Sequence, residues 1–352
     1  PHHFEIQHAS GSGLTCAMSA LTVRACANAA CTALYTGGVS GSLTASGAPT
    51  VAWDGTSGGA SGSGFVIPVG ASSVTKNVQV STPGSVVFGV GGAIPTSCTF
   101  GAPQCTFSAS DAGLFVTNSL TGSEATIPAQ TAGITSAQLY LRALQASTSN
   151  PAVCTPAIAG KTVAVNLGYA CNDPTTCSSG NRLTVNSTAV AGSPNSSPTQ
   201  NSTPVNLNFD ANGSAPITLN YADVGRITLY ASTTVTPPGG AAASLRGNSN
   251  AFVVKPFSFV LSGVQCQGAT ANPGAADAQG GKFCPAGEDF SLTVTAVASG
   301  GVATPNYGRE VMAESVRLVP ALVGGLGLTG NPAVAGSFGS FSNWVASGSA
   351  FS

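Results

Sequence analysis

The sequence predicts an all-β protein built from antiparallel β-sandwiches, on three observations. Helix signals are scarce, because 45 glycines and 22 prolines among 352 residues leave few uninterrupted windows of about a dozen residues. Short segments of alternating apolar and polar residues recur, such as KTVAVNL from Lys161 and FSLTVTAV from Phe290. Clusters of Gly, Pro, Asn and Asp separate these segments, a spacing that is typical of sandwiches.

The segment from Val205 to Ser232, VNLNFDANGSAPITLNYADVGRITLYAS, illustrates the pattern. Two alternating runs flank DANGS, in which Asp210 and Gly213 supply turn geometry, so we expect a hairpin. The Asp223-Val-Gly225 corner and the alternating run after it resemble the penultimate turn and last strand of immunoglobulin-like domains. The run AQLYLRAL from Ala137 alternates as well, and we expect a strand there.

A weak repeat divides the chain into tandem immunoglobulin-like antiparallel β-sandwich domains. Each copy begins with an aromatic-led strand (HFEIQHAS, GLFVTNSL, FSFVLSGV) and continues with a second strand (ALTVRACA, AQLYLRAL, FSLTVTAV). We expect the first sandwich at 1–105 and the second at 106–255, with a long polar insertion from Ala189. The third, at 256–352, lacks the corner and last strand, so we expect it to be incomplete with an open sheet edge.

Ten cysteines indicate disulfides and export through an oxidising compartment. No C-x2-C pair occurs and the only histidines are His2, His3 and His8, which does not favour a zinc site. The spacing predicts three bridges: Cys26–Cys31, Cys98–Cys105 and Cys266–Cys284. The pairing of the others stays open; they are Cys16, Cys154, Cys171 and Cys177.

The charge content excludes several function classes. Only 7% of residues are charged and the formal net charge is −1, so the sequence offers no basic face for nucleic acid. No apolar run reaches the roughly 18 residues that span a bilayer, and the run from Val316 is broken by Pro320. We expect no transmembrane segment in this stretch and no cofactor.

Catalytic motifs are absent or lie in the wrong context. Gly55-Thr-Ser57-Gly-Gly59 matches the G-x-S-x-G elbow, yet it lies in a Gly/Ser-rich stretch and no histidine follows His8. The 12 acidic residues lie mostly in turn contexts, for example Asp173, Asp210 and Asp223. The sequence therefore predicts that the protein is not an enzyme, with no catalytic, cofactor-binding or metal-binding residues.

Several blocks resemble the MshQ-like proteins of the mannose-sensitive haemagglutinin (type IV) pilus system of Gram-negative bacteria. They are HFEIQH, LTVRACANAACTALYTGGVSGSL, SCTFGAPQCTFSASDAG, NYADVGRITLYA and ATPNYGRE, and they extend along essentially the whole chain. The resemblance is to the β-rich C-terminal region of that family. It implies an extracellular, pilus-associated structural or adhesion protein whose partners are other pilus or cell-surface proteins.

Two function classes remain open from the residues themselves. One is a rigid stalk or tip element of stacked sandwiches, which could also self-associate through an open sheet edge. The other is a carbohydrate-binding module that recognises surface glycans by stacking on aromatic rings. The candidate rings lie near Gly-rich segments; they are Trp53, Trp344, Tyr35 and Tyr307. Coplanar exposed rings would favour the module, and end-to-end packed units would favour the stalk.

Overall fold

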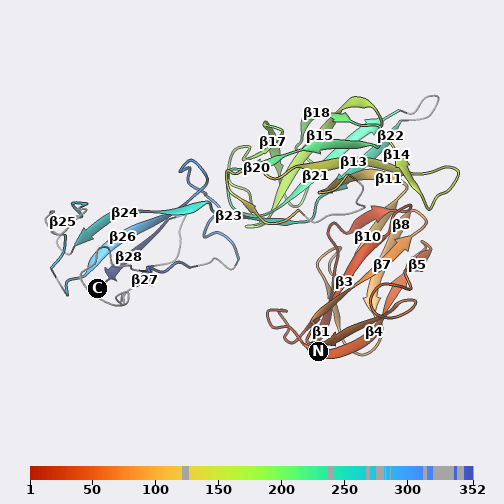
Figure 1. The fold of residues 1–352 in the computed structure, drawn as a ribbon, viewed down its shortest axis with the longest axis horizontal. Helices are drawn as coiled ribbons and strands as arrows, with labels where there is room; N and C mark the ends of the chain where they lie inside the picture. Colours follow the sequence, from red (N-terminus) through yellow and green to blue (C-terminus); the bar gives the residue numbers. More distant parts are fainter. Residues whose placement is uncertain are drawn as a thin grey trace.

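The computed structural model describes residues 1–120, 127–236, 242–266, 270–274, 281, 283–285, 287–311, 315–319, 337–338 and 345–351. Over these residues the chain forms 28 strands and no helix, so the predicted all-β fold is confirmed. The strands gather into three units along the chain, with the N-terminus in the first unit and the C-terminus in the third (Figure 1). No helix in the described part could cross a membrane.

The first unit is a sandwich of two five-stranded sheets. One sheet has the order β5 (Val51–Trp53), β7 (Ser73–Val80), β3 (Ser19–Cys26), β1 (His3–Gln7) and β9 (Thr96–Cys98). The other has the order β2 (Ser12–Leu14), β10 (Thr106–Ser110), β8 (Gly84–Val90), β4 (Gly37–Ser46) and β6 (Gly64–Val69). Alternate side chains of the two sheets form one buried core, which includes Ile6, Val23, Phe65, Phe88 and Phe107.

The second unit is the largest. A small sheet joins β11 (Ala112–Thr117), β13 (Leu139–Ala146), β14 (Cys154–Pro156) and β19 (Ser214–Ile217). The facing sheet has the order β12 (Gln130–Thr131), β23 (Phe252–Lys255), β21 (Gly225–Val235), β15 (Lys161–Asp173), β17 (Thr188–Ser193), β16 (Leu183–Val185) and β20 (Leu219–Tyr221). On it, β18 (Thr203–Phe209) pairs with β15, and β22 (Ala243–Asn248) pairs with β21.

The third unit contains one described sheet. Its order is β25 (Thr270–Ala271), β24 (Ser258–Cys266), β26 (Phe290–Val297), β28 (Val345–Phe351) and β27 (Ser337–Phe338). The buried side chains of β26 alternate, as the sequence pattern predicts for a strand with one covered face.

The three repeated strand pairs occupy matching places in the three units. In each unit the aromatic-led strand pairs antiparallel with the second strand of the repeat: β1 with β3, β11 with β13, and β24 with β26. In each pair a large apolar side chain stands opposite an alanine, and the pairs are Phe4–Ala25, Leu114–Ala143 and Phe259–Ala296. The sequence repeat therefore marks the strand pair that begins each unit, while the predicted domain boundaries stay a prediction.

Two local expectations differ from the structure. The DANGS turn does not close a hairpin ladder, because β18 pairs with β15 and β19 pairs with β13 in the opposite sheet. Asp210 Oδ1 accepts hydrogen bonds from the backbone N–H groups of Asn212 and Ser214, so the turn forms as expected and connects two sheets. The loop-like stretch from Ala189 is also shorter than predicted, because its first residues extend β17.

Candidate functional site at the joints between units

The ten cysteines form five disulfides, and no described cysteine is free. Three are the predicted pairs, Cys26–Cys31, Cys98–Cys105 and Cys266–Cys284. The cysteines whose pairing the sequence left open form Cys16–Cys154 and Cys171–Cys177. Four of the bridges close loops within one unit, and one connects two units.

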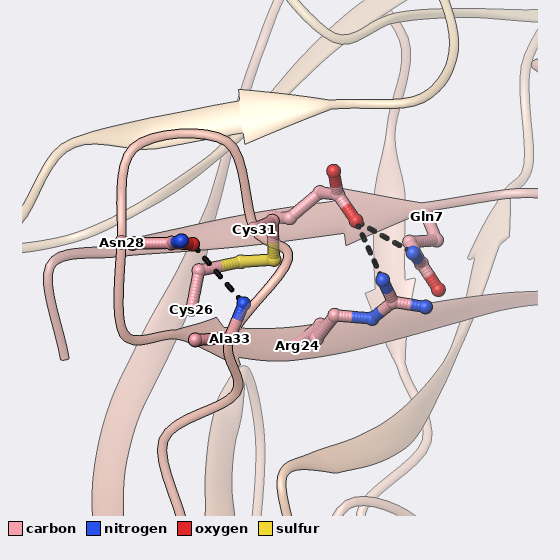
Figure 2. Close-up of polar contacts among 7 residues, drawn as sticks. Gln7, Arg24, Cys26, Asn28, Cys31 and Ala33 are labelled. Atoms are coloured by element: carbon pink, nitrogen blue, oxygen red, sulfur yellow. Dashed lines mark hydrogen bonds and ion pairs between the residues drawn. A yellow bond between two sulfur atoms is a disulfide. The ribbon is translucent and has the colours of Figure 1, made fainter. Parts of the chain in front are cut away.

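The Cys26–Cys31 bridge shows how a short bridge fixes a surface loop (Figure 2). Inside the loop, Asn28 Oδ1 accepts a hydrogen bond from the backbone N–H of Ala33 at 3.2 Å. Cys31 takes a positive φ of 51°, which is uncommon for a residue other than glycine. The bridge begins at the end of β3 and thereby ties the following loop to the sheet.

The first joint, between the first and second units, is covalent. Cys16 follows β2 and Cys154 begins β14, and their disulfide spans 138 residues of sequence with the Cα atoms 5.1 Å apart. Leu14 and Leu144 are buried beside it and form a small apolar cluster separate from both main cores. A bridge of this kind holds two units together with little apolar surface.

Hydrogen bonds support the disulfide at the first joint. Asp111, between β10 and β11, accepts a hydrogen bond from Thr15 Oγ1 at 2.7 Å. The carbonyl of Thr15 accepts a second one from Gln79 Nε2 at 2.8 Å. Asn248 of the second unit donates to the carbonyl of Ser10 of the first at 3.4 Å. Asp111 and Gln79 thus hold the loop that carries Cys16, and Asn248 links the segment before β2 to the second unit.

The second joint, between the second and third units, has a continuous apolar core. The buried cluster of the second unit extends into the third and includes Val294, Ala296 and Tyr307. The backbones also meet, because the N–H of Ser299 donates to the carbonyl of Ala132 at 2.9 Å. A Cβ atom at Gly133 would lie 2.8 Å from the backbone nitrogen of Ser299, so only glycine allows this approach.

A buried carboxylate lies at the centre of the second joint. Asp223 Oδ1 accepts hydrogen bonds from the backbone N–H groups of Val224 at 2.9 Å and Asn306 at 3.0 Å. Its Oδ2 accepts one from the hydroxyl of Ser178. Burial raises the pKa of Asp223 above its usual range, although these donors favour the charged form. One side chain therefore joins a loop of the third unit to two loops of the second.

Asn306 completes this network from the third unit. Its Nδ2 donates to Tyr221 Oη at 3.3 Å and to the carbonyl of Val224 at 3.2 Å. Its Oδ1 accepts a hydrogen bond from Arg309 Nη1 at 3.1 Å. Burial, with the Asp223 charge nearby, raises the pKa of Tyr221, so its hydroxyl stays protonated.

The network brings together two distant sequence blocks. NYADVGRITLYA supplies Tyr221 and Asp223, and ATPNYGRE supplies Asn306 and Arg309, about 80 residues later. The sequence predicts only a turn role for Asp223. Two features of the sequence could have indicated this network. Asp223 is one of few charged residues and lies next to an apolar strand, and the polar block ATPNYGRE lies between strands.

A cavity of about 530 Å³ lies beside the second joint. Arg226 and Lys255 line it together with Asp173, Phe259 and Glu310. The two carboxylates are engaged, because Asp173 accepts a hydrogen bond from the N–H of Val311 and Glu310 accepts one from the N–H of Gly308. Burial raises the pKa of Glu310. These bonds fix the loop after Asn306, so the cavity walls belong to the joint.

The three aromatic candidates that the structure describes do not form one exposed surface. Tyr35 and Trp53 are half-buried against the core of the first unit. The Trp53 ring packs edge-on against the Phe88 ring, with the ring centroids 5.9 Å apart. Tyr307 is buried at the second joint. Trp344 lies outside the described residues. Glycan contact by these side chains stays a prediction.

Ser57 has a structural environment. Its Oγ accepts a hydrogen bond from the N–H of Asn77 at 2.9 Å. The buried ammonium of Lys76 donates to the carbonyls of Ser57 at 2.8 Å and Ala60 at 2.7 Å. The Gly/Ser-rich loop is thus folded around a lysine side chain.

His8, the last histidine in the sequence, has a structural environment as well. Its Nδ1 accepts hydrogen bonds from the backbone N–H groups of Ser10 and Gly11.

Family models cover most of the chain. Residues 95–248 match the first Ig-like domain of DUF6701, a domain of unknown function. Residues 255–351 match the second domain of DUF6701. Residues 2–96 match DUF8613, another domain of unknown function. With the described sheets, the first match shows an immunoglobulin-like β-sandwich fold, as the sequence predicts.

The similar proteins and structures do not identify a function for this chain. No curated protein matches the chain. The D0-D1 domain of intimin is similar at 14% identity, covering 69% of this chain and 96% of its own, with a TM-score of 0.28. The Yersinia pseudotuberculosis adhesin InvE is similar at 14% identity, covering 71% and 56%, with a TM-score of 0.19. Scores at this level do not bear on what the chain does.

Proposed function

We propose that the chain is a rigid stalk or tip element of an extracellular, pilus-associated adhesion protein, made of stacked immunoglobulin-like units. The observation that carries the proposal is that specific contacts connect the units at both joints, Cys16–Cys154 at the first and the Asp223–Asn306 network at the second. Units joined by free linkers would instead be expected to move relative to one another.

The remaining chemistry of the chain fits a structural role. Five disulfides suit an oxidising compartment, and a chain with a net charge of −1 has little long-range electrostatic attraction for a charged substrate. The side chains that could resemble a hydrolase site, Ser57 and His8, hold local turns of the first unit. We infer a non-enzymatic protein at the cell surface that reaches it through an oxidising periplasm.

Association with pili is tested by co-sedimentation. The 352-residue chain is mixed with sheared, purified type IV pili at physiological salt and centrifuged, with flagella from the same cells as the control filament. The proposal predicts that the chain sediments with the pili and stays in the supernatant with the flagella. Recovery in the supernatant in both cases would contradict the pilus assignment.

The same experiment distinguishes the glycan alternative. A carbohydrate-binding module predicts that competing free sugars release the chain from the pellet and that Trp53→Ala weakens binding. The stalk proposal predicts no effect of either, because Trp53 packs on Phe88 within the first unit.

A further inference from the structure

Two loops of the second unit line a polar cavity of about 510 Å³. One loop, residues 175–181, lies between β15 and β16, and the other, residues 192–201, leads from the end of β17 towards β18. The volume falls within the range of about 300–1,000 Å³ that is typical of ligand pockets. Among the described residues that line the cavity none is charged, and most carry a hydroxyl or an amide group.

The first loop is held against the sheet beneath it. Tyr169 of β15 is buried, and its Oη accepts a hydrogen bond from the backbone N–H of Arg182 at 3.2 Å. The same hydroxyl donates to the carbonyl of Gly180 at 3.4 Å. The Cys171–Cys177 disulfide ties the beginning of the loop to the end of β15. These bonds fix one wall of the cavity.

The second loop is closed on itself by Ser193, which is buried. Its Oγ donates to the carbonyl of Asn201 at 2.8 Å and accepts from the N–H of Asn201 at 3.0 Å. Asn201 Nδ2 donates to the carbonyl of Gly192 at 3.2 Å. Both walls are therefore ordered before a ligand binds, which lowers the entropic cost of binding.

Free hydrogen-bonding groups from both loops line the cavity. The exposed side chains that form no hydrogen bond with another described residue are Thr175, Thr176, Asn181, Asn195 and Ser196. An asparagine amide offers two donors and an acceptor oxygen, and a hydroxyl both donates and accepts. The hydroxyl groups of a sugar also donate and accept, so they can pair with every group in this set.

Other classes of ligand suit the cavity less well. An ionic ligand would lose hydration and meet no opposite charge among the described lining residues. An apolar ligand would leave the amides and hydroxyls unsatisfied. A nucleobase stacks on an exposed ring, whereas the ring of Tyr169 is buried. Peptides are usually bound in extended form along a sheet edge or a groove, and this cavity lies between two loops.

We propose that the cavity binds a neutral mono- or disaccharide through hydrogen bonds to Asn181 of one loop and Asn195 of the other. The site is separate from the predicted aromatic candidates, because Tyr35, Trp53 and Tyr307 do not line it. It goes beyond the stalk function and does not depend on it. The stalk proposal places no sugar in the pilus contact, so a sugar bound here leaves that contact in place.

Binding is measured by two-dimensional amide NMR of the isotope-labelled 352-residue chain. The probes are glucose, galactose, N-acetylglucosamine and lactose, with glucuronate as the charged comparison. At least one neutral sugar is expected to shift the side-chain amide signals of Asn181 and Asn195 in a saturable way. Glucuronate is expected to bind more weakly than that sugar, because the cavity lining offers no cation to pair with it.

A double variant tests the residues of the site. Asn181→Ala with Asn195→Ala is expected to weaken binding of the same sugar by on the order of tenfold or more, because both amides lose their hydrogen bonds to the ligand. Asn212→Ala is the matched control. Asn212 is exposed on the same unit, its side chain forms no hydrogen bond with another described residue, and it does not line the cavity, so binding should be unchanged. Circular dichroism checks that the variants are folded.

The proposal would be overturned if none of the four neutral sugars shifted the signals of Asn181 and Asn195. Equal weakening by the double variant and by Asn212→Ala would also contradict it. Tighter binding of glucuronate would assign the cavity to a charged ligand instead. Saturable shifts of the same signals by the neutral peptide acetyl-Gly-Ser-Gly-amide, with none by the sugars, would assign it to a peptide.

Discussion

The two joints hold neighbouring units by different physical means. The first combines the Cys16–Cys154 bond with a small apolar cluster around Leu14 and Leu144. The second has no disulfide among the described residues, and combines a continuous apolar core with a buried carboxylate, Asp223. A covalent bond fixes a joint with little buried surface, whereas a non-covalent joint needs a shared core and fully satisfied polar groups.

The largest expected effect comes from opening the first joint. Cys16→Ser with Cys154→Ser should lower the free energy of unfolding by about 5 kcal/mol, because the bridge closes a long loop in the unfolded chain. Cys26→Ser with Cys31→Ser is the matched control, and its loop of sequence separation 5, against 138, predicts about 2 kcal/mol. Calorimetry measures both double variants, and equal losses would contradict the account of the first joint.

The next effect comes from the second joint. Asp223→Ala should cost about 3 kcal/mol, because it leaves the donors of Ser178, Val224 and Asn306 without an acceptor in a buried site. Asp223→Asn should cost much less, since its amide oxygen still accepts from both N–H groups and its NH₂ group can donate to Ser178. Chemical denaturation compares the two variants, and similar losses for both would show that the acceptor set is unimportant.

The raised pKa of Asp223 predicts a pH dependence of the second joint. A carboxyl whose folded-state pKa is raised contributes stability that is fully present below its unfolded pKa of about 4 and is lost as pH rises through the folded pKa. Wild type should therefore lose stability relative to Asp223→Asn as pH rises above about 4. Glu310 shifts in the same direction in both proteins, so the comparison removes its contribution. Melting curves at several pH values give the difference, and a constant gap would refute the assignment to Asp223.

The smallest effect concerns the loop of Ser57. Ser57→Ala removes the acceptor for the N–H of Asn77 and should cost about 1 kcal/mol, with no change in any ester or peptide hydrolysis. Lys76→Met, which removes two hydrogen bonds to the same loop, is a useful companion and should cost more. A large loss of a measured hydrolytic activity in Ser57→Ala would overturn the non-enzymatic interpretation.

Local alternation and repeated blocks were enough to predict many strands, such as β15 and β26, and the two strands that open each unit, because these depend on residues close in sequence. Alternation alone also predicted a strand in SVRLV from Ser315, where the structure has none. The short bridges followed for the same reason, since Cys26 and Cys31 must lie close together. Cys16–Cys154 and the meeting of Asp223 with Asn306 depend on how whole units pack, which local spacing does not encode. The same limit explains DANGS, where the turn was predicted and the sheets that it connects were not.

The claim that both joints are fixed is tested most directly by small-angle X-ray scattering of the wild-type chain beside Cys16→Ser/Cys154→Ser and Asp223→Ala. The account predicts that one arrangement of the three units fits the wild-type curve. Each variant should loosen its own joint. The ensemble of arrangements that fits its curve should therefore span a wider range of radii of gyration than that of the wild type. A wild-type curve that requires many arrangements, or two variants that scatter as wild type does, would contradict the account.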